Sequence, residues 1–176
     1  KFKHRKRKYI SRRIYLAKII IDLTYLLIVN KKNTYLRIIG ITENDFNNIY
    51  PYCLIPKNVR NKITFMGRLS HEETVKYILG CDCYIFIRRS DKRNNAGFPT
   101  KFAESYTCGV TIITTDVSNV GEYIRKSGKG SLLKDMTTQG ISEAMLYQID
   151  NKLKSKSLDN TFHYESFIQP TENWLK

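Results

Sequence analysis

The residues best suited to bind a charged ligand lie in one run, from residue 88 to residue 104. This run places a basic loop and Gly97 directly before a helix that we expect to begin at Pro99. The free backbone N–H groups and the dipole of a helix N-terminus favour an anion such as phosphate. The groups available there are a flexible glycine, a hydroxyl and two cations: Gly97, Thr100, Lys101 and Arg88. The run therefore favours a phosphate site, with an ordinary charged surface loop as the alternative.

An acidic residue lies about one turn inside the same expected helix. From that position the carboxylate of Glu104 could accept paired hydrogen bonds from vicinal hydroxyls, as acidic residues do with ribose in dinucleotide sites. The run contains neither the dinucleotide motif G-x-G-x-x-G nor the P-loop G-x-x-x-x-G-K-[ST]. A nicotinamide dehydrogenase and an NTPase are therefore disfavoured.

Expected strands alternate with expected helices along the chain, and these elements must position the loop. The expected strands are short and mostly apolar: 35–40, 62–67, 81–87, 110–114 and 130–133. The expected helices are 43–50, 71–79, 99–108, 119–126 and 138–152. Ser70 and Glu73 form a capping box before the second helix. This alternation predicts an α/β fold, a Rossmann-like doubly wound parallel sheet with helices on both faces. Ligands of such sheets bind outside the carboxyl ends of the strands, where the run 88–104 begins.

The length of 176 residues is typical of one domain. We divide the chain into a basic arm, a Rossmann-like domain and a C-terminal helical tail: 1–13, 14–160 and 161–176. A hydrophobic content of 41% is too high for a disordered polycation. The apolar stretch 14–29 is interrupted by Lys18 and Asp22, which favours a packed helix over a signal peptide or a membrane span. The first residue is Lys1 rather than Met, which fits a processed chain or a piece of a longer protein.

The net charge of +14 is unevenly distributed. The arm at 1–13 holds eight basic residues and no acid, which is more than half of that net charge. A solvated tail, a nucleic-acid patch, an anionic membrane surface and a phosphorylated ligand are all compatible with such an arm. Composition does not choose among them. A polyanion-binding or nucleic-acid-binding α/β domain that grips through the arm is therefore carried as the alternative function.

The four cysteines do not form a recognisable metal site. They stand at 53, 81, 83 and 108 without any C-x-x-C spacing, and the three histidines are far apart in sequence. Zinc sites use such ligands at short, regular spacings. We therefore expect no metal, and we expect free thiols in a reducing compartment.

Four ordered segments carry a resemblance to a known family. They are 95–105 (NAGFPTKFAES), 108–116 (CGVTIITTD), 63–73 (ITFMGRLSHEE) and 36–40 (LRIIG). In kind and order they are similar to the C-terminal, nucleotide-sugar-binding domain of retaining GT-B glycosyltransferases of the family 4 type, in the bacterial polysaccharide branch. The match covers roughly residues 34–133, and residues 164–175 resemble the closing helix of that family.

The resemblance implies a role for each residue of the site. The donor diphosphate would lie against backbone at the loop and helix start: Gly97, Phe98, Pro99 and Thr100. Lys101 and Arg88 would be the catalytic partners of the diphosphate, and Glu104 would hold the ribose hydroxyls. Gly67 and Arg68 would flank the nucleobase.

The sequence departs from the family pattern at three places. Ala96 stands where the first acid of the E-x(7)-E motif is expected, so the usual carboxylate contact to the donor sugar is missing. Thr111 replaces a proline, which is a small packing change. A glycine-rich first strand with its phosphate-binding loop is not recognisable before Ile14.

The expected function follows from the resemblance. The chain would bind a nucleoside-diphosphate sugar, whose sugar a retaining enzyme transfers to an acceptor hydroxyl of a glycan or lipid-linked acceptor in polysaccharide or glycolipid synthesis. Helix dipole and basic side chains would stabilise the leaving diphosphate, so no metal or other cofactor is expected. We expect the acceptor domain to be absent from this chain and the chain to be inactive alone. We also expect a cytoplasmic location, with peripheral contact to the inner face of the membrane as a further hypothesis and nucleic acid disfavoured as a partner.

Overall fold

The computed structural model describes residues 34–52, 55–151, 157–167, 170 and 173. The chain divides into two compact units, 1–69 and 70–176, and each is described by itself. The basic arm at 1–13 and the helix expected at 14–29 lie outside the described residues. The division into an arm, a domain and a tail stays a prediction.

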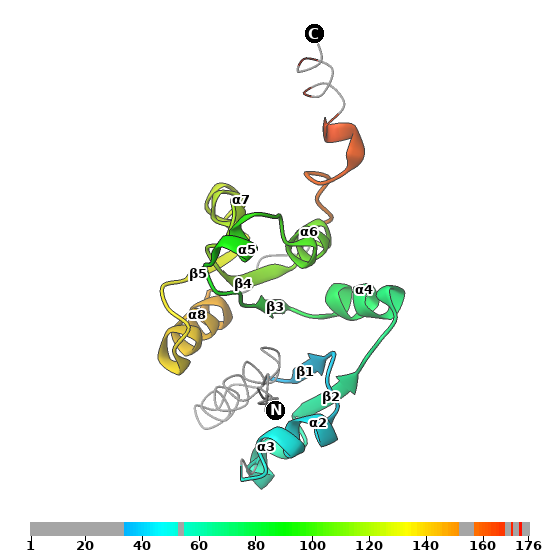
Figure 1. The fold of residues 1–176 in the computed structure, drawn as a ribbon, viewed down its shortest axis with the longest axis vertical. Helices are drawn as coiled ribbons and strands as arrows, with labels where there is room; N and C mark the ends of the chain where they lie inside the picture. Colours follow the sequence, from blue (N-terminus) through cyan, green and yellow to red (C-terminus); the bar gives the residue numbers. More distant parts are fainter. Residues whose placement is uncertain (1–33, 53–54, 152–156, 168–169, 171–172, 174–176) are drawn as a thin grey trace, which may run out of the picture. The chain divides into compact units, whose positions relative to one another are not determined.

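The first unit contains a two-stranded parallel sheet with two short helices (Figure 1). Strand β1 (Leu36–Ile39) pairs with β2 (Ile63–Gly67), with Leu36 opposite Ile63. Helix α2 (Glu43–Ile49) begins with a capping box and is followed by α3 (Lys57–Arg60). The core consists of apolar side chains from the strands, the helices and the loop before α2: Ile41, Phe46, Val59 and Ile63.

The second unit is built on a three-stranded parallel sheet in the order β3–β4–β5. The strands are β3 (Cys83–Phe86), β4 (Thr111–Thr115) and β5 (Gly130–Leu133). All five residues of the central strand β4 are buried. Burial on both faces is typical of a parallel sheet that helices cover on both sides.

Helices cover both faces of this second sheet. They are α4 (His71–Gly80), α5 (Lys92–Asn95), α6 (Thr100–Thr107), α7 (Val120–Ser127) and α8 (Thr138–Asp150), followed by the 3-10 helix η1 (Tyr164–Phe167). Helix α6 packs on β3 and β4, α7 packs on β5, and α8 packs on β4 and β5. Figure 1 shows α6 and α7 over one face of the sheet and α8 on the opposite face. Helix α4 packs against α6.

The structure confirms the predicted parallel, Rossmann-like α/β class, because every described strand pair is parallel and helices flank the sheets. The strands form two sheets, one in each unit, rather than one described sheet. Cys81, expected at the start of a strand, is instead the C-cap of α4, and its N–H donates to Ile78 O. Helix α5 lies in the segment that was expected to be loop, and α3 lies in a segment for which no element was predicted. No helix among the described residues is long and apolar enough to span a membrane.

Candidate functional site

The loop after β3 is fixed at the carboxyl edge of the sheet. The backbone N–H of Arg88 donates to Thr115 Oγ1 over 3.0 Å, and the same hydroxyl donates to the carbonyl oxygen of Arg88 over 2.6 Å. These two bonds join the ends of β3 and β4. The start of the basic loop therefore lies beside the end of the central strand, as predicted for a ligand site of this fold.

The loop itself folds into the short helix α5. Asp91 is its N-cap, and its carboxylate accepts the backbone N–H of Asn94 over 2.8 Å. The Asn94 amide donates to the carbonyl oxygen of Arg89 over 2.8 Å. Sequence reasoning missed this helix, although an aspartate before a short polar helix is a recognised N-cap signal.

Asn95 joins this loop to the loop between β4 and α7. Its side-chain oxygen accepts the backbone N–H of Ser118 over 2.8 Å, and its amide nitrogen donates to Ser90 Oγ over 3.1 Å. Ser118 has a φ of 55°, the left-handed region that costs a serine conformational energy. The two loops at the carboxyl ends of β3 and β4 are thus connected by side chains rather than only by the sheet.

Gly97 borders open space. A methyl group at Gly97 would meet no heavy atom of the described chain within 4 Å. At Gly109 the same group would lie 2.0 Å from the carbonyl oxygen of Ser157. Packing within the described chain therefore requires a glycine at 109 but not at 97, and the room beside Gly97 is available to a ligand.

The N-terminus of α6 has no side-chain cap. Pro99 is the N-cap residue, its side chain makes no capping hydrogen bond, and the first turn contains no acid. The carbonyl oxygen of Pro99 accepts the N–H groups of Phe102 and Ala103. The N–H groups of Thr100 and Lys101 precede these and have no acceptor within the helix, as at any helix start. The positive end of the α6 dipole is therefore not neutralised by the helix's own residues.

The loop that leads to this helix start is basic. Within the described ranges, four basic side chains of the loop form no ion pair with a carboxylate: Arg88, Arg89, Lys92 and Arg93. Lys101 Nζ lies 2.7 Å from Glu104 Oε2, one turn further along α6. The Lys101 side chain is 40% exposed and that of Glu104 is 23% exposed. The arrangement can accept an anion at the helix start and can offer a carboxylate beside it.

Comparison with known proteins shows to which family the chain belongs. Residues 5–162 match the family described as glycosyl transferases group 1. The chain belongs to this family. A relative, described as an uncharacterized glycosyltransferase from Methanocaldococcus jannaschii, is 23% identical over 118 residues. That alignment covers 67% of this chain and 29% of the relative, so the matched part spans less than a third of the relative's length.

The site residues predicted in this group 1 chain fall into both units. The loop and α6 bring seven of them into one segment of the second unit: Arg88, Gly97, Phe98, Pro99, Thr100, Lys101 and Glu104. Gly67 and Arg68 belong to the first unit, at the end of β2. Gly67 has a φ of 63° and its N–H donates to Ile41 O, so a turn in the left-handed region requires this glycine.

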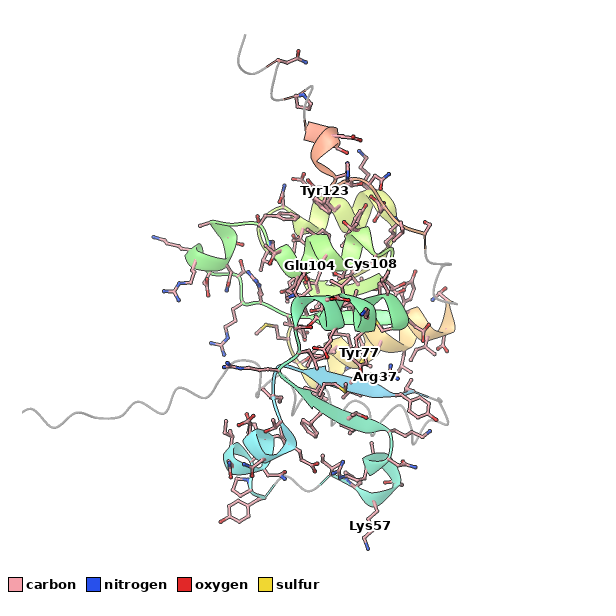
Figure 2. All side chains as sticks on the ribbon, turned by 90° about the vertical axis from the view of Figure 1, so that its right-hand side faces the viewer. Arg37, Lys57, Tyr77, Glu104, Cys108 and Tyr123 are labelled. Atoms are coloured by element: carbon pink, nitrogen blue, oxygen red, sulfur yellow. The ribbon has the colours of Figure 1, made fainter. Side chains whose placement is uncertain are left out.

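Hydrogen bonds, charge and burial shift the pKa values of three groups in the two units. The pKa of Asp45 is lowered by hydrogen bonds from Thr42, with a smaller contribution from the charge of Arg68. Burial, together with the nearby charge of Glu104, raises the pKa of the Cys108 thiol (Figure 2). Burial raises the pKa of Cys83 to about 12. Both thiols are therefore protonated at neutral pH, and neither is suited to act as a nucleophile.

Cysteines, histidines and acids do not gather into a metal site in the part of the chain that the structure describes. Cys81, Cys83 and Cys108 are free thiols. Ala96, the C-cap of α5, is exposed and presents a methyl group where the family pattern has an acid. The adjacent Asn95 is engaged with Ser118 and Ser90, so its side chain is committed to holding the loop.

Proposed function

We propose that this group 1 glycosyltransferase chain is the donor-binding domain, the C-terminal half of a GT-B enzyme, and binds a nucleoside-diphosphate sugar at the N-terminus of α6. The observation that carries the proposal is the uncapped start of α6, with open space at Gly97 and a basic loop leading to it. An anion is the ligand that such a helix start favours. The family's chemistry, transfer of a sugar, supplies a diphosphate as that anion.

In this proposal the diphosphate accepts hydrogen bonds from backbone N–H groups of the loop and helix start. Gly97, Phe98 and Thr100 offer them, and Lys101 and Arg88 add full positive charge. Pro99 has no N–H to give. Its part is to fix the backbone at the turn, and its carbonyl oxygen is already used within α6.

Glu104 binds the ribose hydroxyls in this proposal. Its carboxylate lies within 2.7 Å of the Lys101 ammonium, so the phosphate-binding and ribose-binding groups are neighbours. This spacing suits a ligand in which ribose and diphosphate are also adjacent. When the ligand binds, Lys101 shifts toward the diphosphate or is shared between the diphosphate and the carboxylate.

The chemical step that we propose is retaining transfer to an acceptor hydroxyl. As the bond between the sugar and the diphosphate breaks, negative charge develops on the leaving diphosphate. Lys101, Arg88 and the dipole of α6 stabilise that charge, so the proposal requires no metal. Gly67 and Arg68 flank the nucleobase. The acceptor, a glycan or lipid-linked acceptor in polysaccharide or glycolipid synthesis, binds to a domain outside this chain. We propose a cytoplasmic location, with peripheral membrane contact.

Calorimetric titration of the chain with UDP, GDP and ADP tests donor binding, with inorganic pyrophosphate as a probe without ribose. We expect one nucleotide to bind, and Glu104→Ala to weaken it about 10- to 100-fold, as expected for a lost hydrogen bond to a charged group. Pyrophosphate should bind Glu104→Ala at least as well, because Lys101 loses its partner. Glu143→Ala, which removes an exposed acid of α8, is the matched control and should change neither affinity.

Binding of a polyanion is the second candidate, and the net charge of +14 favours it. Lys and Arg contacts to phosphates release counterions, so such binding weakens steeply with salt. If no nucleotide binds at millimolar concentration and single-stranded nucleic acid does, the donor-binding proposal is wrong. If a nucleotide binds and Glu104→Ala does not weaken it, the role of Glu104 is wrong.

A further inference from the structure

We propose that Phe162, in the segment that follows α8, is a positioning residue for the loop at Gly97 and Phe98. The ring of Phe162 holds Phe98, and Phe98 holds the backbone N–H groups that bind the donor. This inference rests on the proposed function, because it names what orders that same site.

The ring of Phe98 faces an aromatic cluster rather than the ligand. Its centroid lies 5.3 Å from that of Phe162 and 5.7 Å from those of Phe102 and Tyr123. Phe98 is still 36% exposed, so these contacts cover it only in part. Aromatic pairs at such separations are each favourable beyond the burial of area. The side chain therefore ties the loop to α6, to α7 and to the C-terminal segment at once.

The C-terminal segment is held to the second unit by contacts that do not involve Phe98. The N–H of Asp159 donates to the carbonyl oxygen of Thr107 over 3.0 Å. Lys129 Nζ lies 2.6 Å from Asp159 Oδ2, and both side chains are largely buried. The carbonyl of Ser157 lies against Gly109, where no side chain would fit. The segment that carries Phe162 is therefore held in place by contacts that are independent of Phe98.

The position of Phe98 in the loop gives this contact its effect. On one side Asn95 is bonded to Ser118 and Ser90, and on the other Pro99 begins α6. Between these fixed points Gly97 has no side chain to restrict it. The ring of Phe98 therefore limits the freedom of the N–H groups at 97 and 98. Removing Phe162 removes one of its three ring contacts, and a looser loop must be ordered when the ligand binds.

Backbone order parameters from amide relaxation and nucleotide titration of the full chain test this inference together. We expect Phe162→Ala to lower the order parameters at Gly97 and Phe98 without changing them at Ile112 and Ile113 in β4. We expect the same variant to bind the nucleotide about three- to tenfold more weakly, the effect of losing the pair of Phe162 with Phe98. The variant also loses the ring contacts of Phe162 with Phe102, Tyr106 and Tyr123, so its free energy of unfolding is measured in parallel. Phe162→Tyr keeps the ring and should restore both values. His163→Ala, one residue further along, is the matched control and should change neither.

Each outcome bears on one statement. Unchanged order parameters at Gly97 and Phe98 in Phe162→Ala overturn the positioning role, whether or not any nucleotide binds. If the order parameters fall but the unsubstituted chain binds no nucleotide, the loop contact stands and the proposed function fails. If they fall equally in β4, the residue is merely structural and the inference is wrong. Phe162→Leu serves as the ring deletion if the alanine variant does not fold, and the same outcomes apply to it.

Discussion

Helices α4 and α6 begin in opposite ways within the same unit. At α4, Ser70 Oγ accepts the N–H of Glu73 over 3.2 Å, and the Glu73 carboxylate accepts the N–H of Ser70 over 2.8 Å. Glu72 adds a second acid to that first turn. At α6, Pro99 offers no side-chain cap, the first turn has no acid, and the loop before it is basic.

The difference shows how one physical feature serves two purposes. Each helix has a partial positive charge at its N-terminus. At α4 the chain's own carboxylates neutralise that charge, which stabilises the helix and leaves little attraction for an anion. At α6 the helix's own residues leave that charge unneutralised, and Gly97 borders open space, which the proposed function assigns to a ligand. Stability is given up at α6 where the proposed function needs affinity.

The largest expected difference between α4 and α6 is the effect on nucleotide affinity of an acid introduced at the first residue of the helix. Thr100→Asp places a carboxylate where the diphosphate is proposed to bind, so nucleotide affinity should fall about 100-fold, or ~3 kcal/mol. The same carboxylate interacts favourably with the positive end of the helix dipole, so it should raise the thermal stability of the chain slightly. Calorimetry and thermal denaturation measure the two effects. His71→Asp at α4 is the matched control, and a similar loss of affinity there would end the comparison.

Alanine at two glycines of the second unit should separate packing from ligand access. Gly109→Ala should lower the free energy of unfolding by more than about 2 kcal/mol, because φ is 69° and the new methyl group meets Ser157. Gly97→Ala should change it by less than about 1 kcal/mol. Nucleotide affinity should nevertheless fall in Gly97→Ala. Denaturant unfolding and calorimetry check both statements, and full affinity in Gly97→Ala would mean that the open space is not used.

Removing the α4 cap should affect stability alone. Ser70→Ala deletes the oxygen that accepts the Glu73 N–H, and we expect a loss of about 1 kcal/mol in the free energy of unfolding. Nucleotide affinity should be unchanged, because α4 takes no part in the proposed site. Affinity lost in proportion to stability would show instead that titration reports the folded fraction only.

The smallest expected effect is the pH dependence of the same cap. Hydrogen bonds from Ser70 hold the pKa of Glu73 below its ordinary value of 4.5. A lowered pKa contributes stability above that value, and the contribution is lost as pH falls through the pKa of the folded state. Thermal denaturation between about pH 6 and pH 3 should therefore show a smaller fall in Glu73→Gln than in the unsubstituted chain. An equal fall would assign the acid sensitivity to other groups.

Local features of the site were predictable from sequence, and contacts between distant residues were not. The helix start at Pro99, the glycine before it and the capping box at Ser70 are each encoded within a few residues. The hydroxyl of Thr115 that fixes Arg88 lies 27 residues away, and Ser118 lies 23 residues from Asn95. No periodicity in the sequence indicates such pairs.

Two further differences have local causes. The run from Cys81 to Ile87 is apolar except for Asp82, so Cys81 was expected in the strand although it is the C-cap of α4. The ion pair of Lys101 and Glu104 follows from their spacing of three residues on one helix face. Lys101 was predicted to bind the diphosphate and Glu104 the ribose, whereas in the structure the two side chains form an ion pair with each other.

The central claim is that the N-terminus of α6, and not that of α4, binds the donor diphosphate. Backbone amide chemical shifts measured during titration with UDP, GDP and ADP test it most directly. We predict saturable shifts at Gly97, Phe98, Thr100 and Lys101 for the nucleotide that binds, with none at residues 71–73 of α4. Shifts confined to basic surfaces away from α6, or shifts of equal size at both helix starts, would contradict the account.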